Sequence, residues 1–390
     1  MNKTFLEFFS GIGLVRAGLE CEGWNCLYAN DISLDKKEIY ELNFGSDHLH
    51  TEDVWKVSSK SIPAAFLATA SFPCTNTSIA GDRKGLKGEH SSAFHGFYKL
   101  LSEQKERHAQ PQVVMLENVQ GLLTSRGGKD VAEIIGLLNK LNYFVDMIEV
   151  DAINFVPQSR PRIFVIGVQG DIASKVMAIP KRGFLQCNNS HPARTLKIIK
   201  ALYSDPSFKI GHFDLPPLPV RRAALDSIIE PIPDSSHLWW NDERVTALMN
   251  QMSKNHLNAV TQAIALNKKS YFTVYRRVRK TGSMAEVRSD GVAGCLRTPR
   301  GGSSKQILLV CGNSKIQVRL MTPREYARLQ GTSDSFQIST RQNDTTRSLF
   351  GLGDAVCVPV IRWIAANILN KIYTSVASEE QPSQLAVNEL

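Results

Sequence analysis

The chain contains few cysteines and arranges none of them as a metal site or a disulfide framework. Its 390 residues include 7 cysteines, an odd number, scattered along the chain without a CxxC pair. Structural zinc sites and disulfide-stapled secreted domains depend on closely spaced cysteines. The sequence therefore predicts a reduced, cytoplasmic protein that holds no metal.

Long apolar segments are also missing. No run approaches the roughly 18 residues that a membrane span needs. The N-terminal stretch MNKTFLEFFSGIGL is interrupted by Glu7 and is followed by nothing that looks like a cleavage site, so it predicts a buried strand and not a secretory signal. A composition of 43% hydrophobic and 21% charged residues is typical of a soluble globular enzyme. We expect no association with a membrane.

Negative charge is in short supply. Lys and Arg exceed Asp and Glu by 46 to 37, a net charge of +9, and a basic surface attracts polyanions over long range. The excess is concentrated in residues 268–305, where ten Lys or Arg stand against two acidic residues and are interleaved with Tyr271, Phe272 and Tyr275. Such a run is either a solvated face or, with aromatic residues and glycines among the bases, a nucleic-acid surface. We favour the second interpretation.

Short apolar runs alternate with helical patterns over the first 170 residues. The predicted strands are 4–10, 26–30, 64–72, 113–118, 143–150 and 162–168, and the predicted helices are 14–23, 91–108 and 130–141. Strands separated by helices of this length form parallel βαβ units. The predicted fold class is therefore α/β, with a doubly wound, mostly parallel sheet.

The pattern changes after about residue 170. Residues 213–222 and 230–236 are rich in proline, which is excluded from central strands. Residues 241–257 follow with the pattern of a polar helix. At 390 residues the chain has room either for two domains or for one large domain that carries an insertion.

Two glycines follow the first predicted strand. Gly11 and Gly13 stand between that strand and the first predicted helix, in a turn that brings backbone N–H groups close to a ligand at the carboxyl edge of the sheet. A dinucleotide fingerprint needs a third small residue at position 16, which Arg16 occupies. The turn therefore disfavours a nicotinamide cofactor and favours a nucleoside without a pyrophosphate.

Acidic residues follow two further strand ends. Asp31 ends the second strand, where a carboxylate accepts hydrogen bonds from ribose hydroxyls, and Asp53 is placed to bind an adenine amino group. Taken singly, each is better explained as a helix cap or a turn residue.

Reactive side chains gather at the same predicted edge. Cys74 follows the strand 64–72, Glu117 ends the strand 113–118, and two arginines, Arg160 and Arg162, open a later strand. Loops at neighbouring strand ends converge on one crevice in such folds. Cys74 alone would be explained as a buried structural residue, but a thiol, a carboxyl and two guanidinium groups are together predicted to meet beside the cofactor.

The motifs resemble, in order and spacing, those of the DNA (cytosine-5) methyltransferases of bacterial restriction–modification systems. The matching segments are FSGIG (9–13), FPC (72–74), ENV (117–119), QSRPR (158–162), REYARLQG (324–331) and GDAV (353–356). They cover roughly residues 4–170 and 319–372. The resemblance implies the S-adenosylmethionine-dependent methyltransferase fold with a smaller target-recognition domain.

The chain departs from the family pattern in two places. Family members usually have Gln after the Pro-Cys pair, where this chain has Thr75. Their last motif usually reads Gln-x-Gly-Asn, where this chain has Gly351 and Asp354. Both departures lie next to functional groups, while the nucleophile and its partners are intact.

The resemblance implies a role for each matched residue. Cys74 adds to C6 of cytosine, which makes C5 nucleophilic enough to accept a methyl group. Glu117 hydrogen-bonds N3 and the exocyclic amine, and Arg162 holds O2. Arg160 orients the thiol or a nearby phosphate. The implied methyl donor is S-adenosyl-L-methionine, and its predicted contacts are Phe9, Gly11, Ile12, Gly13, Asp31, Ile32, Asp53, Val54, Pro73 and Asp354.

Domain organisation and partners follow from the same resemblance. We predict a catalytic and cofactor-binding domain over 1–175, a target-recognition domain over 176–345, a segment returning to the first domain over 346–376 and a disordered tail over 377–390. The Gly-rich segment 80–88 predicts a mobile lid. We expect a monomer whose partner is double-stranded DNA, with a cognate restriction endonuclease acting separately.

The target cytosine has to leave the duplex before any of these groups can reach it, at a cost of a few kcal/mol. The basic insertion is expected to supply the compensating contacts and to read the sequence. The candidates for guanine or phosphate contacts are Arg276, Arg277, Arg297 and Arg300.

Two other functions stay open. One is a tRNA cytosine-5 methyltransferase of related fold, although such chains carry a shorter insertion than this one. The other is a catalytically inactive DNA-binding homologue, which would have no need of an intact nucleophile. Amino-group methyltransferases are disfavoured because they carry an Asp- or Asn-Pro-Pro-aromatic motif where this chain has SFPC (71–74).

Overall fold

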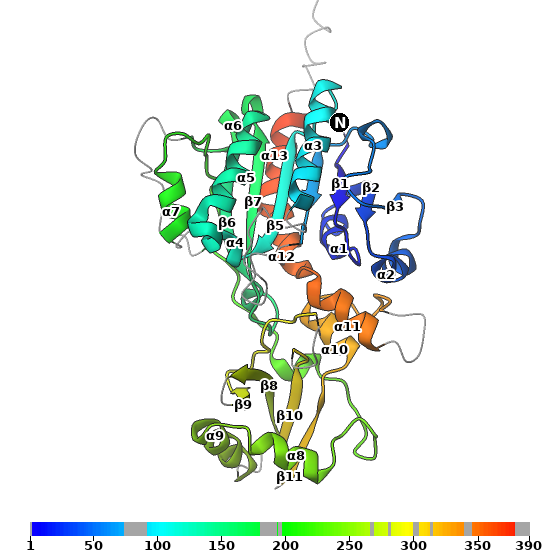
Figure 1. Cartoon of the computed structure of the whole chain (residues 1–390), viewed down its shortest axis with the longest axis vertical. Helices are drawn as coiled ribbons and strands as arrows, with labels where there is room; N and C mark the ends of the chain where they lie inside the picture. The colour runs from blue at the N-terminus through cyan, green and yellow to red at the C-terminus, as the bar shows by residue number, and fades with distance from the viewer. Residues whose placement is uncertain are drawn as a thin grey trace, which may run out of the picture.

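The chain folds around two β-sheets. The computed structural model describes residues 2–73, 92–179, 193, 197–265, 269–279, 282–298, 304–312, 315–338 and 345–378. Within these residues, a seven-stranded sheet forms the larger part and a four-stranded sheet the smaller part. Figure 1 shows the large sheet at the top, the small sheet at the bottom, and α10 and α11 between them.

The large sheet confirms the predicted fold class. Its strands are β1 (Thr4–Phe8), β2 (Asn25–Asp31), β3 (Leu49–Thr51), β4 (Leu67–Ala70), β5 (Val113–Val119), β6 (Tyr143–Asp151) and β7 (Pro161–Gln169). They lie in the order β3-β2-β1-β4-β5-β7-β6. All neighbours pair in parallel except β7, which is antiparallel to both β5 and β6. The sheet is thus doubly wound and mostly parallel.

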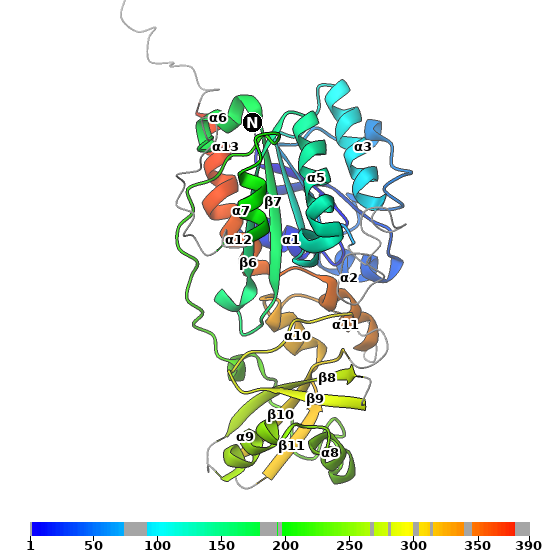
Figure 2. The same cartoon turned by 60° about the vertical axis from the view of Figure 1, so that its left-hand side comes forward.

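Helices cover both faces of this sheet (Figure 2). They are α1 (Leu14–Glu20), α2 (Leu34–Phe44), α3 (Ser92–Glu106), α4 (Gly121–Thr124), α5 (Lys129–Lys140), α6 (Gly170–Val176) and α7 (Lys197–Tyr203). Because successive strand residues point to opposite faces, Phe5 joins the core under α1, α2 and α6, whereas Leu6 joins the core under α3 and α5. Burial on both faces explains why the strands are apolar throughout.

A long apolar helical segment returns the chain to the large sheet. Its parts are α11 (Thr345–Asp354), α12 (Val358–Ile364), the π-helical turn Ala365–Leu369 and α13 (Asn370–Ala377). Residues 345–377 are long and apolar enough to cross a membrane by length and composition, but 61% of the most apolar window is buried inside the protein. Ile361, Ile364 and Ile372 belong to the same core as α1. The apolar character of this segment is therefore explained by packing.

Residues 197–213 also pack on the large sheet. The Tyr203 hydroxyl donates a hydrogen bond to the buried Asp146 of β6, and Val145 N–H donates to the Lys209 carbonyl at 3.1 Å. Phe213 N–H donates to the other Asp146 oxygen at 2.8 Å. The polypeptide thus stays on the first sheet beyond the boundary predicted at 175.

The small sheet is antiparallel and is formed largely by the basic run. Its strands are β8 (Ser270–Arg279), β9 (Gly282–Arg288), β10 (Ile307–Gly312) and β11 (Lys315–Leu320), in the order β11-β10-β8-β9. The accompanying helices are α8 (Asp242–Met249), α9 (Lys254–Ala265) and α10 (Pro323–Leu329). None of these strands was part of the prediction. In β8 and β9, basic residues and glycines obscure the alternation that marks a strand.

The single helix predicted over 241–257 is wrong. The chain forms α8 and α9 with a break between them, where Met252 makes a parallel bridge to Ala285 of β9. Ala285 N–H donates to the Gln251 carbonyl at 2.9 Å. A tertiary contact to the sheet thus replaces the helical hydrogen bonds at this point.

Candidate active site

A carboxylate and a guanidinium meet at one edge of the large sheet. Glu117 lies near the end of β5 and Arg162 at the start of β7, and the distance from Arg162 Nε to Glu117 Oε1 is 3.0 Å. Because β7 is antiparallel, Val119 pairs with Arg162, so the start of β7 lies at the edge where β5 ends. The one reversed strand therefore brings the two predicted residues together.

Burial determines the electrostatics of this pair. Glu117 and Arg162 are both largely buried. Burial raises the pKa of the Glu117 carboxyl, and the positive charges of Arg162 and Arg160 oppose that rise. A carboxyl with a raised pKa holds a proton more readily, which is suited to donating a hydrogen bond to a ring nitrogen.

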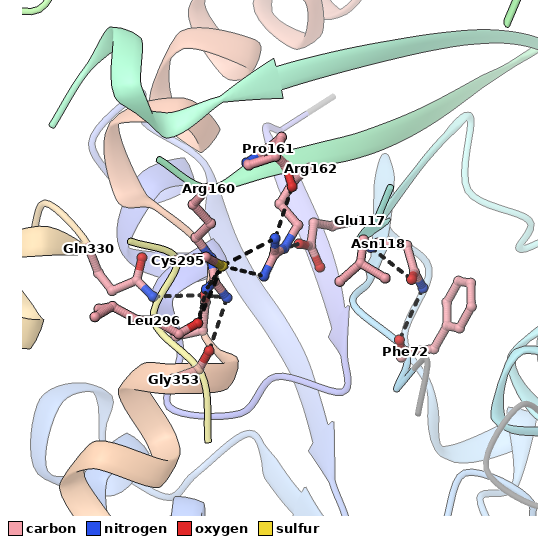
Figure 3. A network of polar contacts seen from close by, with 12 residues as sticks. Phe72, Glu117, Asn118, Arg160, Pro161, Arg162, Cys295, Leu296, Gln330 and Gly353 are labelled. Carbon is pink, nitrogen blue, oxygen red and sulfur yellow. Dashed lines mark hydrogen bonds and ion pairs between the residues drawn. The ribbon is translucent and has the colours of Figure 1, made fainter. Parts of the chain in front are cut away.

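Asn118 fixes the chain that leads to the predicted nucleophile. It is buried, and its side-chain amide donates to the Phe72 carbonyl at 3.2 Å (Figure 3). The next residue, Pro73, is exposed at the end of this segment. Cys74, Thr75 and the predicted lid at 80–88 lie outside the described residues. The described structure therefore positions the approach to Cys74.

Arg160 binds backbone groups of the insertion and of the C-terminal segment through its guanidinium. It is fully buried, and its guanidinium donates to the carbonyl oxygens of Leu296, Gly353 and Ala355 at 2.8, 3.1 and 2.6 Å. Its own N–H donates to Asp151 Oδ1 at 2.6 Å. These bonds tie β7 to the insertion and to the C-terminal segment. Arg160 thus acts as a positioning residue for these segments.

Gln158 ties the same three parts together. Its buried amide nitrogen donates to the Leu329 carbonyl at 2.8 Å, and its amide oxygen accepts from Leu296 N–H at 3.1 Å. The residues of the motif QSRPR therefore have different roles. Gln158 and Arg160 bind backbone groups of the insertion and of the C-terminal part, and Arg162 pairs with the Glu117 carboxylate. Gln158 belongs to a motif that the sequence analysis identified, but its positioning role is visible only in the tertiary contacts.

A second cysteine lies in this site and was missed. Cys295 Sγ is 3.4 Å from Arg160 Nη1 and 3.9 Å from both terminal nitrogens of Arg162. Figure 3 shows Arg162 between Cys295 and Glu117. Burial raises the pKa of the Cys295 thiol, and the positive charges of Arg160, Arg162 and Arg297 lower it. The effect of the three arginines is larger, so the pKa of Cys295 lies below its usual value. Sequence offers no signal for this residue, because it is one unpaired cysteine in the insertion.

The glycine turn after β1 forms as predicted. Gly11 and Gly13 both have positive φ, at 58° and 82°, and Phe9 adopts φ 56° although it carries a side chain. A Cβ on Gly13 would lie 2.4 Å from a ring atom of Phe44, so a larger residue does not fit there. Strain of this kind at Phe9 is typical of ligand-binding turns.

Arg16 fills the place of the missing third glycine. Its guanidinium donates to Glu20 at 2.6 Å and to the Tyr40 hydroxyl at 3.1 Å, and it packs over the Phe44 ring. The side chain therefore joins α1 to α2.

The two aspartates predicted to bind the nucleoside, Asp31 and Asp53, both accept hydrogen bonds from backbone N–H groups. Asp31 accepts from Gly11 N–H at 2.7 Å and from Ser33 N–H at 2.8 Å, so it ties the glycine turn to the end of β2. Asp53 accepts from Trp55 N–H at 3.0 Å and forms a turn. Each carboxylate oxygen has a second lone pair for a ligand hydroxyl or amine.

The family is decided by comparison with known proteins. The family model of the C-5 cytosine-specific DNA methylases matches residues 3–370. The chain belongs to this family. It is therefore a DNA (cytosine-5)-methyltransferase that uses S-adenosyl-L-methionine as methyl donor.

Individual relatives match over nearly the whole chain. A Type II methyltransferase of Dactylococcopsis salina, M.DsaV, is 29% identical over 94% of this chain and 86% of its own length. M.HhaI of Haemophilus parahaemolyticus is 25% identical over 93% of each chain. Among solved structures, the Dnmt2 methyltransferase of S. pombe superposes with a TM-score of 0.61 at 18% identity, over 95% of this chain and 99% of that one. That last likeness shows the fold.

The methyltransferase has groups that suit its cofactor along the edge from β1 to β3. Ser10 Oγ is buried beside the glycine turn and has no hydrogen-bond partner among the described residues. Ile32 follows Asp31 directly, and 68% of its apolar side chain is exposed. Ile12 and Val54, in contrast, are buried. A hydroxyl without a partner among the described residues suits the polar tail of S-adenosyl-L-methionine, and an exposed apolar side chain suits its flat base.

The four predicted DNA-contacting arginines of the methyltransferase fall in different environments. Arg276 and Arg277 are neighbours on β8 and therefore point to opposite faces of the small sheet. Arg276 lies over the Trp240 ring at 5.7 Å, whereas Arg277 is 54% exposed beside Tyr275 and Glu286. Arg297 is exposed next to Cys295. Arg300 lies outside the described residues.

Proposed function

We propose that this enzyme is the modification methyltransferase of a Type II restriction–modification system. It methylates C5 of one cytosine within a specific duplex DNA sequence and works in the cytoplasm as a monomer, with a cognate endonuclease acting separately. The observation that carries the proposal is the largely buried Glu117–Arg162 pair. At the same edge of the sheet, Asn118 binds the Phe72 carbonyl, two residues before Cys74 in the sequence. The relatives M.DsaV and M.HhaI bear Type II names and match at similar length.

The proposed reaction starts with covalent catalysis. The Cys74 thiolate adds to C6 of the flipped cytosine while Glu117 donates a proton to N3, which offsets the charge that builds on the ring. Arg162 holds the ring O2 and keeps Glu117 in place. When bound, S-adenosyl-L-methionine would supply an electrophilic methyl group for C5, with its sulfur as the leaving group. A base then removes the C5 proton, the thiolate departs as the C5–C6 double bond re-forms, and N3 returns its proton to Glu117.

Trapping with 5-fluorocytosine tests this reaction. Duplex DNA with 5-fluorocytosine at the target should form a covalent complex with the wild type, because fluorine at C5 blocks the final elimination. Cys74→Ser should form none and should lose essentially all methylation, since a hydroxyl is a much weaker nucleophile at neutral pH. Cys21→Ser is the matched control, because Cys21 is exposed on another part of the chain. Methylation without trapping by the wild type would remove Cys74 from the reaction.

The choice between DNA and tRNA needs a direct comparison of substrates. Bisulfite sequencing of plasmid DNA from cells that express the protein should reveal one methylated sequence context. Purified enzyme should transfer labelled methyl groups to that duplex and not to bulk tRNA. The opposite preference would establish the tRNA methyltransferase, and no transfer to either, with DNA binding intact, would establish the inactive homologue.

A further inference from the structure

One of the two departures from the family pattern has a charged partner. Asp354, at the end of α11, stands where relatives usually carry an asparagine. Lys36 Nζ on α2 lies 3.1 Å from Asp354 Oδ2, and the Thr298 hydroxyl donates to Asp354 Oδ1 at 3.2 Å. The extra negative charge is thus matched by a positive one from a distant part of the chain.

The pair lies at the glycine turn. A Cβ placed on Gly11 would lie 3.9 Å from Lys36 Cδ, so the stem of the lysine passes beside this glycine. On the same side, a Cβ on Gly351 would lie 2.7 Å from Ile12 Cγ2, so α11 packs against the turn. The side chains of Lys36 and Asp354 are 24% and 46% exposed. Both charges therefore remain accessible to a molecule bound over β1.

The sheet order indicates which part of the cofactor reaches them. The proposed nucleoside contacts, Asp31 and Asp53, follow β2 and β3, and the methyl group has to reach the edge at Glu117 on β5. Strand β1 lies between these places. The α-amino acid tail branches from the sulfur between nucleoside and methyl group, so it lies over the β1 turn, where Ser10 Oγ is without a partner among the described residues.

We propose that Lys36 neutralises Asp354 and so makes the site compatible with the carboxylate of the cofactor's amino acid tail. The two side chains together replace the neutral amide of the relatives. Without Lys36, the Asp354 carboxylate would face the carboxylate of the tail with no neutralising cation, and like charges at close range weaken binding. This inference rests on the proposed placement of the cofactor along the strand ends.

Equilibrium binding of two ligands to the full-length protein tests the inference. S-Adenosylhomocysteine carries the tail, whereas 5′-methylthioadenosine keeps the nucleoside and sulfur but lacks the tail. Lys36→Met should weaken the binding of S-adenosylhomocysteine about tenfold, which corresponds to about 1.4 kcal/mol. It should leave 5′-methylthioadenosine within about twofold of the wild type. The double variant Lys36→Met/Asp354→Asn should recover S-adenosylhomocysteine binding to within about threefold, and Asp354→Asn alone should not weaken it.

Two further variants separate the possible failures. Lys37→Met is the matched control, because Lys37 pairs with Glu41 at 3.6 Å on the same helix, and it should change neither affinity. Asp31→Ala should weaken both ligands, since both carry the ribose. Unchanged binding of both ligands to Asp31→Ala would refute the cofactor placement itself. Equal weakening of both ligands by Lys36→Met, or no recovery in the double variant, would overturn the role of Lys36 while leaving that placement intact.

Discussion

The catalytic edge of the large sheet and the basic strand β8 of the small sheet both depend on arginine, and they use it in opposite ways. Arg160 is buried, and the terminal nitrogens of its guanidinium donate to carbonyl oxygens. Arg162 is largely buried and pairs with Glu117. On β8, Arg276 and Arg277 lie over Trp240 and Tyr275, and Arg277 stays exposed. A guanidinium with fixed hydrogen bonds holds a geometry before substrate arrives. A guanidinium resting on a ring keeps its donors available for phosphates and bases.

Removing the carboxylate of the catalytic edge should have the largest effect. Glu117→Gln keeps the size and one acceptor but cannot supply a proton, so methylation should slow by about 10²–10⁴-fold. Single-turnover methyl transfer at saturating DNA measures it. The matched control is Glu149→Gln on β6, which β7 separates from β5. Its partner is Gln120 at 2.5 Å, and its activity should stay within about threefold of the wild type. Activity above a tenth of the wild type in Glu117→Gln would mean that the pair is structural.

The second largest effect is expected on the free energy of unfolding, and it tests whether Arg160 holds β7, the insertion and the C-terminal segment together. Arg160→Met removes the guanidinium donor from the carbonyl oxygens of Leu296, Gly353 and Ala355, so the free energy of unfolding should fall by about 3 kcal/mol. Urea denaturation measures the change. Arg362→Met removes an arginine that is 61% exposed and pairs with Glu22, and it should cost about 1 kcal/mol or less. Similar losses in both variants would erase the distinction between buried and exposed arginines.

A buried carboxyl of the large sheet should make stability depend on pH. Burial raises the pKa of Glu7 from 4.5 to about 8. The folded chain therefore binds this proton more tightly than the unfolded chain, so stability is present at low pH and is lost as pH rises from about 4.5 through about 8. Glu7→Gln keeps the acceptor for Arg16 N–H and removes the titration. Relative to the wild type, its free energy of unfolding should rise by up to about 1.4 kcal/mol per pH unit in that range, as denaturation at pH 5.5 and 8 would show. A constant difference would place the titration elsewhere.

The smallest effects belong to β8 and distinguish its two faces. Thr273, on the same face as Arg277, donates to the Val292 carbonyl at 2.9 Å, so this face adjoins the loop that leads to Cys295 and the catalytic edge. Arg277→Ala should cost about 1–3 kcal/mol in binding of the target duplex. Arg276→Ala, on the face packed by α8 and α9, should cost less. Lys305→Ala should weaken all DNA alike and lower the salt slope by about one. Fluorescence anisotropy across salt concentrations measures all three, and equal effects of Arg276 and Arg277 would exclude a single DNA-facing side.

The sequence by itself determined the fold class and most of the strand ends. Apolar runs separated by helices predict a doubly wound sheet, and the glycine turn, Asp31 and Glu117 fall at strand ends where they were expected, because strand and turn patterns are local properties. The motif order brought Glu117 and Arg162 into one hypothesis, and the structure places them 3.0 Å apart.

Only the tertiary structure decided what each polar residue does. Arg160 and Arg162 stand two positions apart in one motif, yet one binds carbonyls from the insertion and the C-terminal segment and the other binds Glu117. The partners of Arg160, Cys295 and Lys36 lie between about 135 and 318 positions away along the chain, and no local pattern encodes such a distance. Burial then selects among the possible roles, since a charge removed from water must find partners wherever the fold brings them.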